Sequence, residues 1–183
     1  MLARNDYYSV KKTIKLEFNM KNKIMKYIKE IFYFFILLIL FANILSFYRS
    51  MHLADQSLPF KSVVLLNQET YALSQDKPTL LYFWATWCPI CKAQSPNIQT
   101  LAKNYNVLTV AVKSGSDKEI QEYLKSHNLD FKVINDYDGS IANKFGISVF
   151  PTTLLYDKDR EFFYSDVGYT STIGLWLRMW WID

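Results

Sequence analysis

The sequence is poor in the residues that most often hold metal ions. Its 183 residues include only two cysteines and two histidines, whereas a structural zinc site asks for about four ligands. His52 and His127 lie far from the cysteines along the chain, and Lys92 follows the second cysteine where haem attachment requires histidine. These shortages exclude a haem-attachment motif and argue against a zinc site.

Positive charge is scarce outside one segment. Residues 1–30 hold eight Lys/Arg against three Asp/Glu, a balance of +5, so the chain's formal charge of +4 leaves −1 for the remainder. Phosphate recognition needs clustered cations, and we therefore expect no nucleic acid among the partners. Repeats and low-complexity segments are also lacking, while 50% of the residues are hydrophobic, enough for a sizeable core.

One long hydrophobic run is present. Residues 31–47, "IFYFFILLILFANILSF", contain no charge over 17 residues, which is the lower limit for crossing a bilayer. Arg49 is the only Lys/Arg in the dozen residues after the run. Four lysines crowd the other flank: Lys21, Lys23, Lys26 and Lys29. The positive-inside rule then places the N-terminus in the cytoplasm.

We therefore predict a cytoplasmic tail at 1–29 and a single-pass transmembrane signal anchor at 30–48. The rest of the chain would lie on the periplasmic or extracytoplasmic side of the cytoplasmic (inner) membrane. Two alternatives are a buried core helix, which is rarely apolar around its whole circumference at this length, and a cleaved signal peptide. Cleavage is disfavoured because "FANILSFYRS" has bulky residues where small ones are needed.

Residues 49–59 are polar and lack a helical pattern, so we interpret them as a tether before a folded domain at 60–183. Within the domain, strand and helix patterns alternate, which predicts an α/β fold with a central mixed sheet flanked by helices. The expected strands are 61–67 and 70–73 as a leading hairpin, then 78–86, 107–113, 130–135, 147–157 and 162–165. The expected helices are 89–104, 117–128, 138–146 and 170–181.

Three local features of these helices can be predicted. Asp117 is placed to cap its helix, and Gly146 to end the short helix before it. In the last helix, five large apolar residues recur at helical spacing, which predicts a face packed on the sheet. They are Ile173, Trp176, Leu177, Trp180 and Trp181.

The two cysteines stand three positions apart in "WCPIC", residues 87–91. At the start of a helix they share one face within disulfide reach. Pro89 suits the first helical position, which puts Cys88 at the N-cap, where free amides and the helix dipole favour a thiolate. Cys88 is thus the expected nucleophile and Cys91 the shielded, resolving thiol. A permanent staple is the alternative, but so short a loop constrains the unfolded chain weakly.

From about residue 60 onward the chain resembles the thioredoxin superfamily, in particular its membrane-anchored TlpA/ResA/DsbE-like and ScsD-like branch. The motifs are "YFWATWCPICKAQSP" and "GISVFPTTLLYD". The resemblance implies a thioredoxin fold in which Pro151 is cis and faces the dithiol. Trp87, Phe150 and Pro151 would bind substrate, and residues 117–135 would form the central insert of the TlpA-like branch.

Three positions depart from the family pattern. Tyr82 replaces the buried Asp of thioredoxins, and Gln94 replaces the Glu of ResA-like proteins, so the usual proton acceptors for the resolving thiol are missing. Phe150 replaces the Thr common before the cis-proline in this branch. These changes alter the expected kinetics and substrate preference without deciding the direction of electron flow.

We expect a membrane-tethered thiol:disulfide oxidoreductase that exchanges disulfides with protein substrates through Cys88 and Cys91. The reaction is paired with a second dithiol/disulfide partner, which in related proteins that act as reductants is a membrane electron carrier. No metal or organic cofactor is needed. Two alternatives are a noncatalytic redox sensor or adaptor, which would not turn over, and a copper-handling protein, as ScsD-like relatives are linked to copper tolerance.

Overall fold

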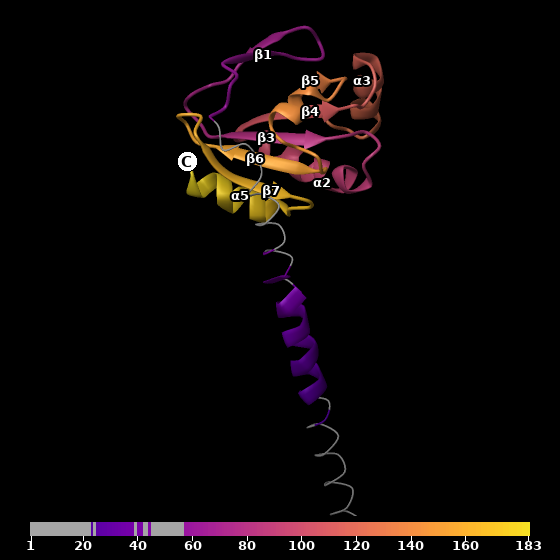
Figure 1. Ribbon diagram of the computed structural model, residues 1–183, viewed down its shortest axis with the longest axis vertical. Helices are drawn as coiled ribbons and strands as arrows, with labels where there is room; N and C mark the ends of the chain where they lie inside the picture. The colour runs from indigo at the N-terminus through magenta and orange to yellow at the C-terminus, as the bar shows by residue number, and fades with distance from the viewer. Residues whose placement is uncertain (1–22, 24, 39, 42–43, 45–56) are drawn as a thin grey trace, which may run out of the picture. The chain divides into compact units, whose positions relative to one another are not determined.

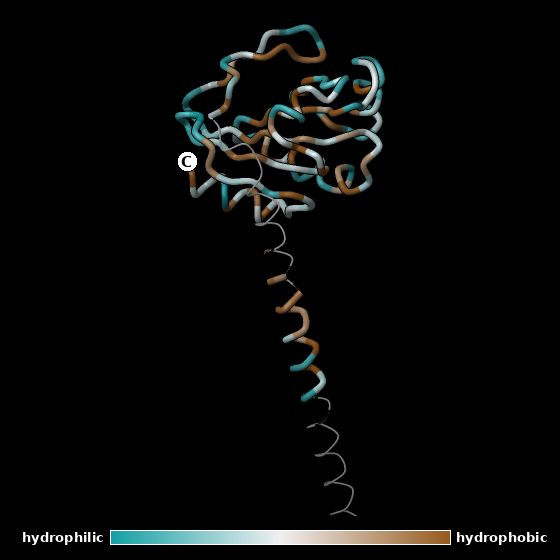
Figure 2. Tube along the Cα trace, in the orientation of Figure 1, coloured by the Kyte–Doolittle hydropathy of each residue, from teal (hydrophilic) through white to brown (hydrophobic). Residues whose placement is uncertain are grey.

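The computed structural model describes residues 23, 25–38, 40–41, 44 and 57–183. The chain forms two compact units, Met1–Leu45 and Ser46–Asp183. In the first unit residues 25–38 are helical with exposed side chains, hydrophilic at the start and hydrophobic further along (Figure 2). Of the helices in the described ranges, none combines the length and apolar character that a membrane span requires. Most of the predicted tail (1–29) and tether (49–59), and part of the predicted anchor (30–48), fall outside the described residues.

The second unit is built on a five-stranded mixed sheet in the order β5-β4-β3-β6-β7 (Figure 1). β3 runs parallel to β4, and β4 to β5, whereas β6 is antiparallel to both β3 and β7. A separate antiparallel pair, β1 with β2, is the predicted leading hairpin. The strands are β1 (Ser62–Val64), β2 (Thr70–Ala72), β3 (Thr79–Trp84), β4 (Asn106–Val112), β5 (Lys132–Asp136), β6 (Thr152–Tyr156) and β7 (Phe162–Val167).

The helices of this unit cover both faces of the sheet. They are α2 (Pro89–Leu101), α3 (Asp117–Ser126), α4 (Ser140–Lys144) and α5 (Thr172–Trp181). Successive side chains of a strand point to opposite faces, so Tyr82 and Trp84 of β3 join a core with α2, α3 and α5. Leu81 and Phe83 join a second core with α4 and the segment before β3. β3 is buried on both faces, and every residue after Thr79 in this strand is apolar or aromatic.

Two helix boundaries test the predictions from local sequence. The prediction that Asp117 caps α3 is wrong by one residue, since Ser116 is the N-cap and forms a capping box with Glu119. The Asp117 carboxylate instead accepts a hydrogen bond from the Asn135 side chain at 2.8 Å. Gly146 ends the short helix as expected, with a φ of 69° that favours glycine.

The prediction for the packed face of α5 is wrong. Leu175 and Met179 are the buried residues, whereas the five predicted core residues are between 48% and 76% exposed. Nearly every side chain of α5 is apolar, so the periodicity alone fits either face. Arg178 helps to fix the rotation of the helix, because its guanidinium lies 3.3 Å from the buried Asp166 carboxylate of β7 and stacks on Tyr164.

Candidate active site

The two cysteines lie where β3 ends and α2 begins, and they are joined by a disulfide with Cα atoms 5.2 Å apart. Cys88 is the N-cap of α2, with extended backbone angles of φ −92° and ψ 111°, and Pro89 occupies the first turn. The Cys91 amide donates a hydrogen bond to the Cys88 sulfur at 3.1 Å. The placement predicted from the sequence is therefore confirmed, and the helix N-terminus directs a free amide at the Cys88 sulfur.

The two cysteine residues differ slightly in access to solvent. Cys91 is fully buried, whereas Cys88 remains 5% exposed. An incoming sulfur must reach its target in line, so the residue that touches the surface is the one a partner can attack. The opening at Cys88 is narrow, and the surface around it decides which partners can approach.

The loop before β6 forms one side of that surface. The Phe150–Pro151 peptide bond is cis, as the resemblance implies. The Pro151 carbonyl accepts a hydrogen bond from the Gly168 amide at 2.8 Å, which ties the loop to the end of β7. The Phe150 ring meets the Trp87 ring edge to face, with centroids 5.9 Å apart. The residue before Cys88 thus contacts the residue before Pro151, and the two motifs form one surface.

Exposed apolar side chains surround this junction. Trp87 is 62% exposed, Ile90 51% and Val149 43%. The indole nitrogen of Trp87 donates to the Lys113 carbonyl at 3.1 Å, which holds the ring in place. Ile90 and Val149 were not predicted as site residues. Both lie within the two motifs, but the sequence does not show that their side chains are exposed.

A pocket of about 200 Å³ extends this surface away from the dithiol. Trp87 and Phe150 form one wall, and Lys113, Gly139 and Asn143 contribute to the others. A Cβ on Gly139 would lie 2.7 Å from the Lys113 side chain, and the glycine has a φ of +82°. Glycine at this position therefore allows the Lys113 chain to lie close against the pocket wall.

Within residues 57–183, the side chains that bond the Cys91 carbonyl carry hydroxyl groups and no carboxylate. The Tyr82 hydroxyl is buried and donates to the Cys91 carbonyl at 3.3 Å, and its burial raises its pKa above the usual range. The Ser95 hydroxyl donates to the same carbonyl at 2.9 Å. At neutral pH these groups therefore position the backbone of Cys91 and do not accept its proton.

Gln94 and Asn97 of α2 connect the dithiol helix to the start of α5. The buried Gln94 side chain accepts from the Thr170 amide at 3.1 Å and donates to the Thr153 hydroxyl at 3.5 Å. Asn97 donates to the Thr170 carbonyl at 3.1 Å and accepts from the Thr172 hydroxyl at 2.8 Å. Gln94 thus has a structural role in which its neutral amide uses both a donor and an acceptor.

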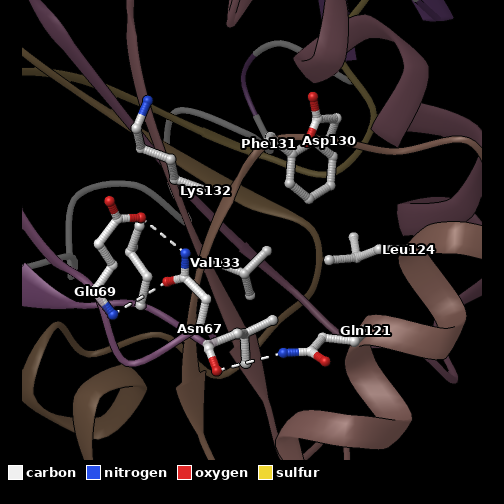
Figure 3. Close-up of a pocket in the computed structure, with 10 residues that line it drawn as sticks. Asn67, Glu69, Gln121, Leu124, Asp130, Phe131, Lys132 and Val133 are labelled. Carbon is white, nitrogen blue, oxygen red and sulfur yellow. Dashed lines mark hydrogen bonds between the residues drawn. The ribbon is translucent and has the colours of Figure 1, made fainter.

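A larger pocket, about 420 Å³, lies between the β1–β2 loop, α3 and β5 (Figure 3). It is at the amino-terminal end of β5, whereas the dithiol follows the carboxyl-terminal end of the parallel strand β3. Three of its polar side chains bond neighbours: Asn67 donates to Glu69, and Gln121 donates to the Leu66 carbonyl. This pocket is therefore separate from the thiol site.

Comparison with known proteins assigns the family. A family model described as the AhpC/TSA family matches residues 55–164. The thioredoxin-like protein of Haemophilus influenzae is 36% identical over 163 residues, which cover 86% of this chain and 95% of that protein. The chain belongs to the AhpC/TSA family.

This AhpC/TSA protein is also similar to the thiol-disulfide oxidoreductase ResA of Oceanobacillus iheyensis, at 35% identity over 102 residues, 52% of this chain and 53% of that one. Among solved structures it resembles a secreted disulfide oxidoreductase of Mycobacterium tuberculosis, homologous to E. coli DsbE. That likeness has a TM-score of 0.58 and 25% identity, and it covers 69% of this chain and 98% of the other. The chain therefore has a thioredoxin-like fold and is a thiol-disulfide oxidoreductase with a Cys88–Cys91 disulfide.

Proposed function

We propose that the protein is a membrane-anchored, extracytoplasmic enzyme that exchanges disulfides with other proteins, with Cys88 as nucleophile and Cys91 as resolving thiol. The observation that carries this proposal is the Cys88 sulfur at the N-cap of α2, 3.1 Å from the Cys91 amide, in a residue that keeps a small exposure where Cys91 has none. A thiolate at Cys88 would be stabilised there by the amide and by the helix dipole.

The exchange proceeds in two steps. The Cys88 thiolate attacks one sulfur of a substrate disulfide, which forms a mixed disulfide and releases the other substrate sulfur as a thiolate. Cys91, deprotonated by solvent, then attacks the Cys88 sulfur, releases the second substrate thiolate and restores the Cys88–Cys91 bond. Two electrons pass to the substrate, and both substrate thiolates take up protons. In the opposite direction the Cys88–Cys91 disulfide oxidises a substrate dithiol by the same steps.

Substrates dock on the apolar surface that surrounds Cys88. Trp87, Ile90 and Val149 are exposed beside it, and Phe150 and Pro151 form the adjacent loop. Such a surface suits extended segments of incompletely folded proteins, whose apolar side chains are still free to bind. A second dithiol/disulfide protein, or an electron carrier in the membrane, restores the starting state.

The location is inferred from the sequence. The uncharged run at 31–47, with lysines on its amino-terminal side only, supports a single-pass anchor with the domain outside the cytoplasm. The similarity to a secreted oxidoreductase supports the same side of the membrane. α3 and β5, which together span the predicted insert at 117–135, support a place in the TlpA-like branch.

Trapping of the mixed disulfide tests the roles of the two cysteines. The reduced Cys91→Ser chain should form a stable adduct with a peptide disulfide through Cys88, detected by mass spectrometry, whereas Cys88→Ser, the matched control, should form none. Repeated reduction of the peptide with an excess of external dithiol should require both cysteines. A single equivalent of reaction without turnover would instead indicate a redox sensor and overturn the enzymatic proposal.

The equilibrium potential against glutathione decides the direction. A difference of about 30 mV is a tenfold change in the equilibrium constant of this two-electron couple. A strongly negative potential identifies a reductant of substrate disulfides, and a high potential identifies an oxidant.

A further inference from the structure

The outward face of α5 is unusual for a protein surface. It consists of five large apolar side chains, which we call the outer face of α5: Ile173, Trp176, Leu177, Trp180 and Trp181. Their spacing places them in one stripe along the helix. The inward residues Leu175 and Met179 already fill the core, so this stripe has no partner within residues 57–183. An exposed apolar stripe of this size normally marks a binding surface.

The chain enters the folded domain beside one end of this helix. The Leu58 amide donates to the Arg160 carbonyl at 2.8 Å, in the turn between β6 and β7. Lys158, in the same turn, pairs with Asp183 at 3.4 Å, directly after α5. The incoming chain and the end of α5 that carries Trp180 and Trp181 therefore meet at the same turn.

The length of chain before Leu58 limits how far this turn can lie from the predicted anchor. The hydrophobic run ends at residue 47, eleven residues before Leu58. Even fully extended, eleven residues reach only about 40 Å. If the run spans the bilayer, as proposed above, the outer face of α5 is held within reach of the lipid surface at all times.

The chemistry of the outer face matches the boundary between lipid head groups and acyl chains. Tryptophan prefers this boundary because its ring is apolar and its N–H is polar. α5 contains no Asp or Glu, and its single charged residue, Arg178, is paired with Asp166. Burial of the stripe in this layer would desolvate no unpaired charge, so its binding should depend on apolar contact and not on anionic lipid.

We propose that the outer face of α5 lies in the interfacial layer of the membrane that holds the anchor; this rests on the anchor assigned under the proposed function. Cys88 follows the end of β3 that pairs with Thr152, whereas the turn at 157–161 follows the opposite end of β6, at Tyr156. The docked domain thus keeps its disulfide at the end of the sheet away from the chain's entry point.

Tryptophan fluorescence can test the proposal in the full-length protein. All five tryptophans lie after residue 80, so the anchor segment contributes no signal. The intact chain is reconstituted into phosphatidylcholine vesicles whose acyl chains carry bromine close to the head group. The Trp176→Phe/Trp180→Phe/Trp181→Phe variant keeps only Trp84 and Trp87, so the emission of wild type minus that of the variant is the signal of the three tryptophans of α5. We expect bromine to quench at least half of this signal.

An Ile173→Glu/Leu177→Glu variant supplies the matched control, because both positions are exposed and the tryptophan reporters remain. Its quenching should fall several-fold, while its disulfide exchange with a soluble peptide stays unchanged. Equal quenching in this variant, or no quenching in a wild-type chain that floats with the vesicles, would overturn the proposal. Cross-linking of two copies through α5 without quenching would overturn it in favour of a dimer. A chain that fails to float would refute the anchor itself, and the docking with it.

Discussion

Two leucines on α5 offer a direct comparison of its two faces. Leu175 is fully buried against the sheet, and Leu177, two positions along, is 50% exposed. Truncation of a buried leucine to alanine costs about 2–5 kcal/mol, because it removes apolar contacts and leaves a cavity. Full burial of a leucine side chain stabilises by about 1.5–3 kcal/mol, so truncation at a half-exposed site should cost about 1 kcal/mol or less. We therefore predict that Leu175→Ala destabilises the domain much more than Leu177→Ala.

Pulse proteolysis in urea can measure the difference in the full-length chain solubilised in a mild detergent. With a urea dependence of about 1–3 kcal/mol per molar, Leu175→Ala should lower the unfolding midpoint by about 1–2 M relative to Leu177→Ala. The two variants make the same chemical change in one helix, so helix propensity cancels in the comparison. A midpoint for Leu177→Ala as low as that for Leu175→Ala would show that the helix packs through its other face, and the assignment of the outer face of α5 would be wrong.

Three further predictions concern single polar groups. Tyr82→Phe removes one hydrogen bond to the Cys91 carbonyl and should lower the free energy of unfolding by about 0.5–1.5 kcal/mol. The pH profile of disulfide exchange should stay unchanged, because burial keeps the pKa of Tyr82 above its usual range. A shifted profile would give Tyr82 a role in proton transfer. Ser116→Ala removes the N-cap of α3 and should lower the free energy of unfolding by about 1 kcal/mol, seen as a lower urea midpoint. Ser126→Ala, at the exposed end of the same helix, should lower it less. Equal decreases would contradict the capping box. Burial raises the pKa of Asp166 above its unfolded value, so the native state binds this proton more tightly. The resulting stability is present below the unfolded pKa of Asp166 and is lost as the pH rises through its native pKa. The free energy of unfolding of Asp166→Asn, measured by urea titration at a series of pH values between these two pKa values, should lack that loss. A pH dependence equal to that of wild type would refute the raised pKa of Asp166.

The sequence predicts the sheet and the dithiol because their signals are local. β3 is apolar or aromatic at every position after Thr79, which indicates a strand buried on both faces. Cys88 before Pro89 indicates an N-cap, and the structure confirms it. In each case neighbouring residues alone determine the conformation.

The sequence fails where the choice depends on tertiary contacts. Apolar residues lie on all sides of α5, and Arg178 is its one charged residue. Hydrophobic periodicity therefore could not choose between Leu175 and Leu177 as the inward residue. The choice depends on Arg178 reaching Asp166, a contact between residues twelve positions apart. The exposure of Ile90 and Val149 was likewise not predictable, because exposure depends on how separate segments pack together and not on the local sequence.

The hydrogen bonds from Gln94 and Asn97 to the start of α5 have a mechanical consequence. Four bonds link the middle of α2 to Thr153, Thr170 and Thr172, so the helix that begins with the disulfide and the helix that carries three of the five tryptophans cannot turn independently. A surface that binds the tryptophans of α5 therefore also fixes the orientation of the Cys88 sulfur. A tilt of the domain on its support would redirect the disulfide by the same angle, and with it the set of partners that can approach.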